Sequence, residues 1–101
     1  MNIEVKEYSC IIYIPNQKEM YIRQSRIFLT NFEALFINYI LDNSGYCNLE
    51  SFTKYLSKVY GREVQRKCIV VYIGRLRRKI YYQTGDKIIK SKYSFGYFIN
   101  S

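Results

Sequence analysis

Apolar and polar positions divide the chain into a β-rich beginning, a helical middle and a β-rich end. The first 29 residues carry short runs of β-branched and aromatic side chains separated by polar ones, which is typical of β-strands. Pro15 and Asn16 supply a turn after the first run. We therefore expect a small antiparallel sheet over residues 1–29, with one polar face and one face covered by a helix. Its expected strands cover residues 8–14, 20–22 and 26–29.

Helical spacing begins at Thr30. Thr30 and Glu33 form a capping-box pattern, in which the hydroxyl and the carboxylate accept hydrogen bonds from the N–H groups at a helix start. A first helix is predicted to begin near Asn31, and the turn residues from Asn43 to Gly45 end it. Its apolar positions recur at helical spacing and make it mostly core: Phe32, Phe36, Ile37, Ile40 and Leu41.

Two further helices are predicted. Asn48 caps a second helix, which Gly61 ends, and a tight link separates it from the first. A third helix is expected to begin between Glu63 and Arg66 and to run to about Tyr82, because no Pro interrupts it. The apolar face of the second helix contains Phe52, Tyr55, Leu56 and Val59.

The chain ends in two strand-like runs, residues 86–90 and 95–99, which a basic segment joins. We expect a terminal β-hairpin. A chain of 101 residues has room for one domain with one modest core. The predicted fold class is therefore α+β in a single domain over residues 1–101. It consists of a sheet over 1–29, three helices over 30–82 and a hairpin over 86–100.

The predicted third helix has two different faces. At about 100° per residue, Ile69, Ile73, Leu76 and Ile80 fall in one narrow stripe, which we expect to be buried. Cations, small residues and one Tyr fall on the opposite side. This opposite face contains Lys67, Val71, Gly74, Arg75, Arg78 and Tyr82, with Arg66, Val70 and Arg77 on its flank.

A basic stripe on a helix is often only a solvated face, so further signals are needed. No Asp or Glu occurs from residue 64 to residue 85, although a solvated helix usually mixes charges for pairing across a turn. Gly74 costs roughly 1 kcal/mol relative to Ala in mid-helix, which suggests that something approaches the backbone there. Val70 and Val71 suit thymine methyl groups, but burial against the second helix is an equal alternative for Val70.

Overall charge supports a polyanionic partner. Sixteen Lys and Arg residues oppose eight Asp and Glu residues, giving a net charge of +8. Such a field favours nucleic acid or an anionic membrane surface, although a merely basic soluble protein has the same composition. No apolar run reaches the roughly 18 to 20 residues that a membrane span needs, and no signal-peptide pattern begins the chain. We expect a soluble, cytoplasmic protein.

Catalytic and metal-binding patterns are missing from the sequence. The chain has no His, and its carboxylates are scattered without a pair that spacing would bring together. Cys10, Cys47 and Cys68 are odd in number and far apart, so we interpret them as reduced, small apolar fillers. We therefore expect no enzyme activity, no catalytic residue, no metal, no cofactor and no small-molecule substrate.

Three groups of residues together resemble the DNA-binding domain of the OmpR/PhoB-type winged-helix family, including its ToxR-like relatives. The resemblance covers nearly the whole chain, and the order and spacing of the groups are more specific than any one of them. The first helix supplies Leu29, Thr30, Glu33, Ile37 and Ile40, and the hairpin supplies Gly96 and Tyr97. The third helix supplies Ile73, Arg75, Leu76, Arg77, Lys79 and Ile80.

The resemblance implies a winged helix-turn-helix fold with an N-terminal antiparallel sheet, three helices and a C-terminal hairpin wing. It also implies that the third helix enters the DNA major groove and the wing reaches the minor groove. Lys67 and Arg75 match helix positions that commonly contact DNA, and Ser91 and Tyr93 match wing positions. The family often has a polar residue at the position of Val70, Ser or Arg at that of Gly74, and Arg or Lys at that of Tyr93. Sequence preference therefore does not transfer, and Lys90 or Lys92 is an alternative minor-groove residue.

Members of this family also carry an N-terminal phosphoacceptor receiver domain or, in ToxR-like proteins, a membrane segment after the DNA-binding domain. This sequence contains neither. If it is a whole protein, control has to come from abundance, dimerisation or a partner. If it is a piece, Met1 favours the ToxR-like layout, with the missing part beyond Ser101. The chain would then be the cytoplasmic part of a membrane-anchored regulator.

The sequence thus predicts a bacterial transcription regulator that binds specific double-stranded DNA, with RNA polymerase or a second copy on DNA as further candidate partners. Arg75 is the leading base reader, because a guanidinium can bridge guanine O6 and N7. Lys67, Arg78, Lys90 and Lys92 are expected mainly at phosphates. For Arg77 and Lys79, a salt bridge or a stem packed on the protein is an equal alternative. These predictions make a DNA-binding set of Arg66, Lys67, Val70, Val71, Gly74, Arg75, Arg77, Arg78, Lys90, Ser91, Lys92 and Tyr93.

Two rival hypotheses remain from the sequence. The first is a protein-interaction module of the same fold that holds another regulator or RNA polymerase. The second is single-stranded RNA binding by the twelve Tyr residues, although most of these stand where strands or helix faces need bulk.

Overall fold

The computed structural model describes residues 3–92 and 95–100, which form an α+β fold with three α-helices and two antiparallel sheets. The first sheet has the order β1-β2-β3-β4, so each strand pairs with the next along the chain. A short 3-10 helix, Pro15–Gln17, connects β2 to β3. The strands are β1 (Lys6–Tyr8), β2 (Ile11–Ile14), β3 (Glu19–Ile22) and β4 (Ser25–Phe28).

The predicted antiparallel sheet is confirmed, but the prediction of a single strand over residues 8–14 is wrong. Residues 8–14 form the end of one strand and the whole of the next, because the chain turns at Ser9, whose φ is 56°. Tyr8 then pairs with Ile11 across this turn. No Gly, Pro or Asn marks the turn, so the sequence carried little signal for it. One face of the sheet is buried, and it contains Ile11, Tyr13, Met20, Ile22 and Ile27.

The first helix, α1 (Asn31–Asp42), begins as predicted. The Thr30 hydroxyl accepts a hydrogen bond from the Glu33 N–H at 3.2 Å, and the Glu33 carboxylate accepts one from the Thr30 N–H at 2.9 Å. This reciprocal pair satisfies two N–H groups that a helix start would leave without partners. Phe36, Ile37 and Ile40 are fully buried, so α1 is the central helix of the core.

The second helix, α2 (Leu49–Tyr60), has the predicted caps. The Asn48 side chain accepts the Ser51 N–H at 2.9 Å, and Gly61 ends the helix in the left-handed region with φ of 67°. The link before it is not a simple connection, because residues Tyr46–Asn48 form a strand, β5. Three residues carry too short a pattern to predict a strand, and only the distant partner β7 makes it one.

The third helix, α3 (Arg66–Thr84), runs two residues past the predicted end before Gly85 stops it with φ of 76°. The second sheet follows with the order β5-β7-β6, formed by β5 together with β6 (Ile89–Lys92) and β7 (Gly96–Ile99). The hairpin is confirmed, but β6 begins three residues later than the predicted 86–90. Asp86 instead belongs to the connection after α3, where its N–H donates to the Thr84 hydroxyl at 3.1 Å.

Gly96 is required where β7 pairs with β5. A Cβ atom at this position would lie 1.8 Å from the Cys47 carbonyl oxygen, closer than any side chain can approach. The two strands therefore pair at this point only because Gly96 has no side chain. This close approach gives the Gly96-Tyr97 pattern of the sequence a structural role.

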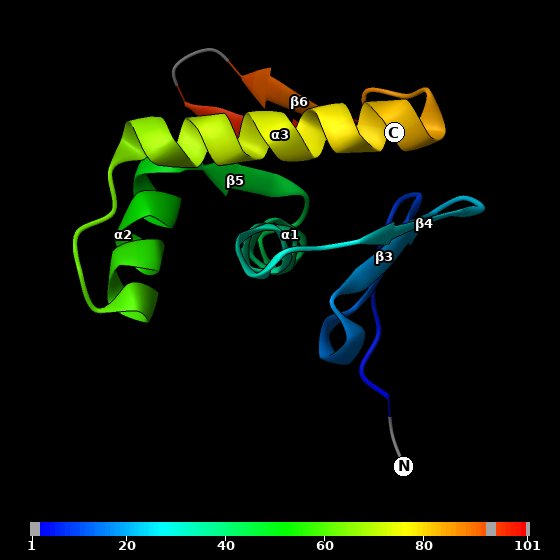
Figure 1. The fold of residues 1–101 in the computed structure, drawn as a ribbon, viewed down its shortest axis with the longest axis horizontal. Helices are drawn as coiled ribbons and strands as arrows, with labels where there is room; N and C mark the ends of the chain where they lie inside the picture. Colours follow the sequence, from blue (N-terminus) through cyan, green and yellow to red (C-terminus); the bar gives the residue numbers. More distant parts are fainter. Residues whose placement is uncertain (1–2, 93–94, 101) are drawn as a thin grey trace.

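Figure 1 shows α3 as the longest element, running across the upper part of the molecule in this view. α2 lies beneath its N-terminal end and the first sheet beneath its C-terminal end, with α1 between them. The hairpin lies above α3 and partly behind it in this view, and the hydrogen bond from Arg77 Nε to the Ile89 carbonyl at 3.0 Å joins the two. No helix among the described residues is long and apolar enough to cross a membrane.

Candidate nucleic-acid interface

The buried stripe of α3 is confirmed. Ile69, Ile73 and Leu76 have no exposed surface, and Ile80 is 1% exposed. Fully burying one such side chain contributes roughly 1.5 to 3 kcal/mol, so this stripe sets the rotation of α3 about its own axis. The opposite face is therefore turned outward by packing, whatever its own chemistry.

The outward face carries the side chains that helical spacing predicted there. Lys67, Arg75 and Arg78 are exposed, Val71 is 51% exposed and Tyr82 is 82% exposed. The three cations thus lie on one side of the helix and remain exposed to solvent. A Tyr exposed to this degree contributes little to the core.

Charge is divided unevenly over the described residues. Six of the eight carboxylates form ion pairs, and none of these pairs uses a cation of the predicted DNA-binding set. Their partners are Lys6, Arg23, Arg26 and Lys54, together with Lys79 on the flank of α3. In the described part of the chain, Lys67, Arg75, Arg78, Lys90 and Lys92 form no ion pair. Many of the cations without an ion pair among the described residues therefore lie on α3 and the hairpin, while Lys18, Lys58, Arg62 and Lys87 are found elsewhere.

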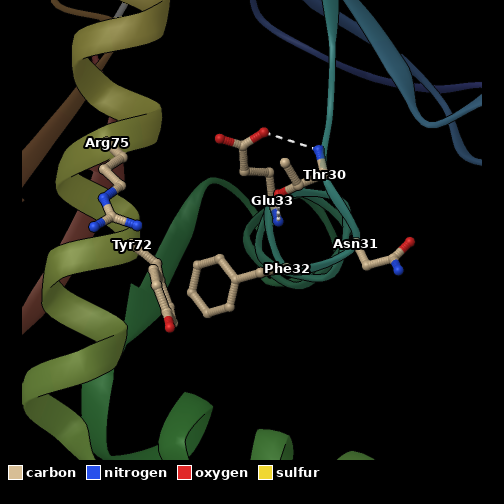
Figure 2. Close-up of a pocket in the computed structure, with 6 residues that line it drawn as sticks. All are labelled: Thr30, Asn31, Phe32, Glu33, Tyr72 and Arg75. Carbon is tan, nitrogen blue, oxygen red and sulfur yellow. Dashed lines mark hydrogen bonds between the residues drawn. The ribbon is translucent and has the colours of Figure 1, made fainter.

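Arg75 is held by an aromatic neighbour that the sequence analysis did not single out. Its guanidinium carbon lies 5.5 Å from the centroid of the Tyr72 ring, within cation–π range. The Tyr72 ring in turn lies 5.2 Å from that of Phe32 on α1. Figure 2 shows the guanidinium pointing along α3 toward Tyr72, beside a pocket that Thr30, Asn31 and Glu33 also line. The spacing of three residues between Tyr72 and Arg75 is the signal that could have found this pair.

Arg77 and Lys79 both have partners within the protein. Lys79 donates to the Glu33 carboxylate at 2.6 Å and to the Phe28 carbonyl at 2.7 Å, so the salt-bridge alternative holds for it. Arg77 is half-buried and donates from Nε to Ile89 at 3.0 Å. Both side chains join α3 to a neighbouring element. A DNA contact by Arg77 stays a prediction, made by a side chain with a structural role.

Two small or apolar positions of α3 are open to the outside. Val70 is 42% exposed and, together with Arg66, Ser91 and Lys92, lines a groove between α3 and the hairpin. A Cβ atom at Gly74 would meet only the Arg78 Nη1, at 3.8 Å. Nothing in the described chain therefore explains the helix-weakening Gly74 by close packing.

The hairpin divides its predicted residues between two faces. Ser91 pairs with Tyr97 and shares the face that carries buried Ile89, toward α3. By the alternation of the strand, Lys90 lies on the opposite face. Lys92, at the end of the strand, lines the groove beside α3, and its amino group is 5.8 Å from the Tyr46 ring. The predicted wing residue Tyr93 lies outside the described residues.

The three cysteines differ in environment. Cys47 is fully buried, and burial raises the pKa of its thiol from 9.0 to about 12. Cys10 is half-buried, but Cys68 is exposed on α3, so its prediction as an apolar filler is wrong. Position 68 lies one residue before the buried stripe, and a step of one residue turns a helix by about 100°. No group of three potential metal-ligating side chains occurs among the described residues.

Comparison of the sequence with protein-family models and with curated proteins finds no match. Any functional conclusion therefore depends on the chemistry of this surface.

Proposed function

We propose that this protein is a sequence-specific double-stranded DNA-binding domain of the winged helix-turn-helix type that acts as a bacterial transcription regulator. In this proposal α3 enters the major groove, the β6–β7 hairpin is the wing at the adjacent minor groove, and α2 is the first helix of the helix-turn-helix. In this proposal the domain is of the OmpR/PhoB type, with ToxR-like proteins among its relatives, as the sequence resemblance implies.

One observation carries the proposal: six of the eight carboxylates pair with cations outside the predicted DNA-binding set, while Lys67, Arg75 and Arg78 on the outward face of α3 have no ion pair among the described residues. Lys67, Arg75 and Arg78 lie on this face, and no Asp or Glu occurs on the helix. Cations on a protein gain affinity for DNA by neutralising phosphates and releasing counterions. A surface that served only solubility would have no reason to separate its charges in this way.

The shape of α3 also supports the proposal. Its 19 residues span about 28 Å at 1.5 Å per residue, and the major groove admits one α-helix. The buried stripe determines which side chains face outward, so a docked helix would present Lys67, Val71, Gly74 and Arg78 together. Arg75 lies at the edge of this row toward α1, over the Tyr72 ring, and in this proposal it reaches a base edge beside the row.

A duplex titration tests the proposal. Sites are first selected from random duplex DNA, and the selected and random duplexes are then titrated at two salt concentrations. A DNA-binding domain has to show a steep loss of affinity with salt, and repeated half-sites in the selected DNA would indicate two bound copies. Absence of selection, or affinity independent of salt, would contradict the proposal.

Arg75→Ala and Lys92→Ala separate base reading from phosphate contact. A base-reading Arg75 is worth roughly 1 to 3 kcal/mol of discrimination, so its loss should weaken selected DNA far more than random DNA. Lys92→Ala should weaken both duplexes about equally. Equal losses on both duplexes for Arg75→Ala would remove the base-reading role.

A specific observation favours the protein-interaction alternative as a second candidate. The solvent-facing side of the first sheet carries Ile12, which is 40% exposed, and Phe28, which is 61% exposed. Large contiguous apolar patches are typical of protein contacts, and these two side chains share one face of the sheet, on β2 and β4. If charge substitutions on α3 left transcription regulation by the protein intact while Phe28→Ser abolished it, this alternative would replace DNA binding.

A further inference from the structure

A basic cleft lies beside the C-terminal half of α3. Gly74, Arg77 and Arg78 of its lining belong to the predicted DNA-binding set, whereas Tyr81, Tyr82 and Lys87 do not. The cleft runs between the helix and the segment that leads into β6. Figure 1 shows the chain turning back after the end of α3 and returning along the helix toward β6. The cleft is lined by Gly74, Arg77, Arg78, Tyr81, Tyr82 and Lys87, together with Ile89.

Helical spacing aligns one wall of this cleft. Gly74, Arg77, Arg78 and Tyr81 recur at intervals of three and four residues, so they form a continuous row along α3. Lys87 contributes a cation from the opposite wall. Three cationic residues therefore line the cleft from two walls, and none of the described residues that line it is acidic.

The carboxylate next to Lys87 in the chain is already engaged. Asp86 forms an ion pair with Arg23, which does not line the cleft. Arg78 and Lys87 are exposed and form no ion pair among the described residues. Arg77 is oriented by its bond to the Ile89 carbonyl, which reduces the side-chain entropy lost on binding a ligand.

The other lining residues have the chemistry to contact a phosphate and the sugar attached to it. Gly74 leaves the helix backbone open, since a Cβ there would meet only the Arg78 Nη1 at 3.8 Å. The rings of Tyr81 and Tyr82 lie 6.3 Å apart, and Tyr82 is 82% exposed. Tyrosine combines an apolar ring with a hydroxyl that donates to phosphate oxygens.

We propose that this cleft, which we name the helix–hairpin cleft, binds a phosphate group. The proposed occupant is a phosphodiester of the bound DNA backbone, so the inference rests on the proposed function and extends its contact surface to Tyr82 and Lys87. A free phosphate or mononucleotide offers the same chemistry and is separated from DNA by the test.

Salt dependence of duplex binding tests the contact. Lys87→Gln should flatten the slope of log affinity against log salt by about 0.9, and should weaken selected and random duplexes alike, by about fivefold to tenfold at 0.1 M salt. Tyr82→Ala should weaken both duplexes in the same uniform way. Lys18→Gln, at the turn before β3, removes the same charge far along the chain from the cleft and should leave the slope unchanged.

If wild-type protein binds duplex while Lys87→Gln and Tyr82→Ala behave like Lys18→Gln, the cleft inference is overturned and the proposed function stands. If no duplex binds, the proposed function fails, and titration with inorganic phosphate and with a mononucleotide decides the cleft by NMR. Saturable shifts of the Gly74, Arg78 and Lys87 amides, lost in Lys87→Gln, would support a phosphate site for a free ligand. Absence of both duplex binding and such shifts would overturn the cleft as well.

Discussion

The Arg75 guanidinium lies over the ring of Tyr72, one turn earlier on α3, with 5.5 Å between the guanidinium carbon and the ring centroid. Tyr72 is itself in contact with Phe32 on α1, so two side chains from two helices support the Arg75 guanidinium. A base-reading side chain that is oriented before binding loses less entropy when it docks. Tyr72 is therefore a positioning residue for Arg75.

Tyr72→Leu is expected to reduce the ratio of selected-DNA to random-DNA affinity by about twofold to fivefold, the equivalent of one exposed cation–π contact. Tyr72→Phe keeps the ring and should keep the ratio, which makes it the matched control. The salt slope should be the same in both variants, because no phosphate contact is removed. Equal ratios for the Leu and Phe variants would contradict the positioning role.

The Lys79–Glu33 pair is expected to stabilise the fold and not to bind DNA. Glu33 is 8% exposed and also caps α1, so Lys79→Met leaves a nearly buried carboxylate without its cation. We expect the free energy of unfolding to fall by about 1 to 3 kcal/mol in urea denaturation. Lys54→Met breaks an exposed pair with Glu50 and should cost at most about 0.5 kcal/mol. Similar losses in the two variants would contradict the role given to burial.

Gly74→Ala separates stability from binding at one position. The added Cβ has room, and Ala is more favourable than Gly inside a helix. The free energy of unfolding should therefore rise by about 0.5 to 1 kcal/mol. If the DNA backbone approaches Gly74 closely, duplex affinity should fall even though the protein is more stable. Gln83→Ala, an exposed change on the same helix, should leave duplex affinity unaltered. Unchanged affinity for Gly74→Ala would show that nothing approaches the helix there.

Alkaline pH should destabilise the protein through Cys47. The thiol has a pKa of about 12 when folded and 9.0 in water, so the unfolded chain loses its proton first. Stability from the buried neutral thiol is fully present below pH 9 and is lost as the pH rises from 9 toward 12, by at most about 1.4 kcal/mol per pH unit.

Cys47→Ala should reduce this slope in urea denaturation under reducing conditions. It should not abolish the slope, because burial also raises the pKa of Tyr13 and Tyr97. Cys68→Ala removes an exposed thiol and should leave the slope as it is in the wild-type protein. An identical slope in the Cys47 and Cys68 variants would show that the buried thiol is not responsible.

Much of the fold follows from signals within a few residues of each other. The capping box at Thr30, the caps at Asn48 and Gly61, and the buried stripe of α3 all arise from contacts along one helix, where sequence spacing translates directly into geometry. The same reasoning placed Lys67, Arg75 and Arg78 on one outward face. A helix needs no distant partner for its pattern to be interpreted.

Only the tertiary structure decided the features that depend on distant partners. β5 exists because β7 pairs with it, and Gly96 is required because the Cys47 carbonyl lies against its backbone. Lys79 is engaged by Glu33, which lies 46 positions away in sequence. The cleft beside Lys87 likewise needed the connection after α3 to return along the helix. Sequence spacing carries no distance between residues on separate elements, so the pairing of strands, the partners of cations and the shape of the surface emerge only when the whole core packs.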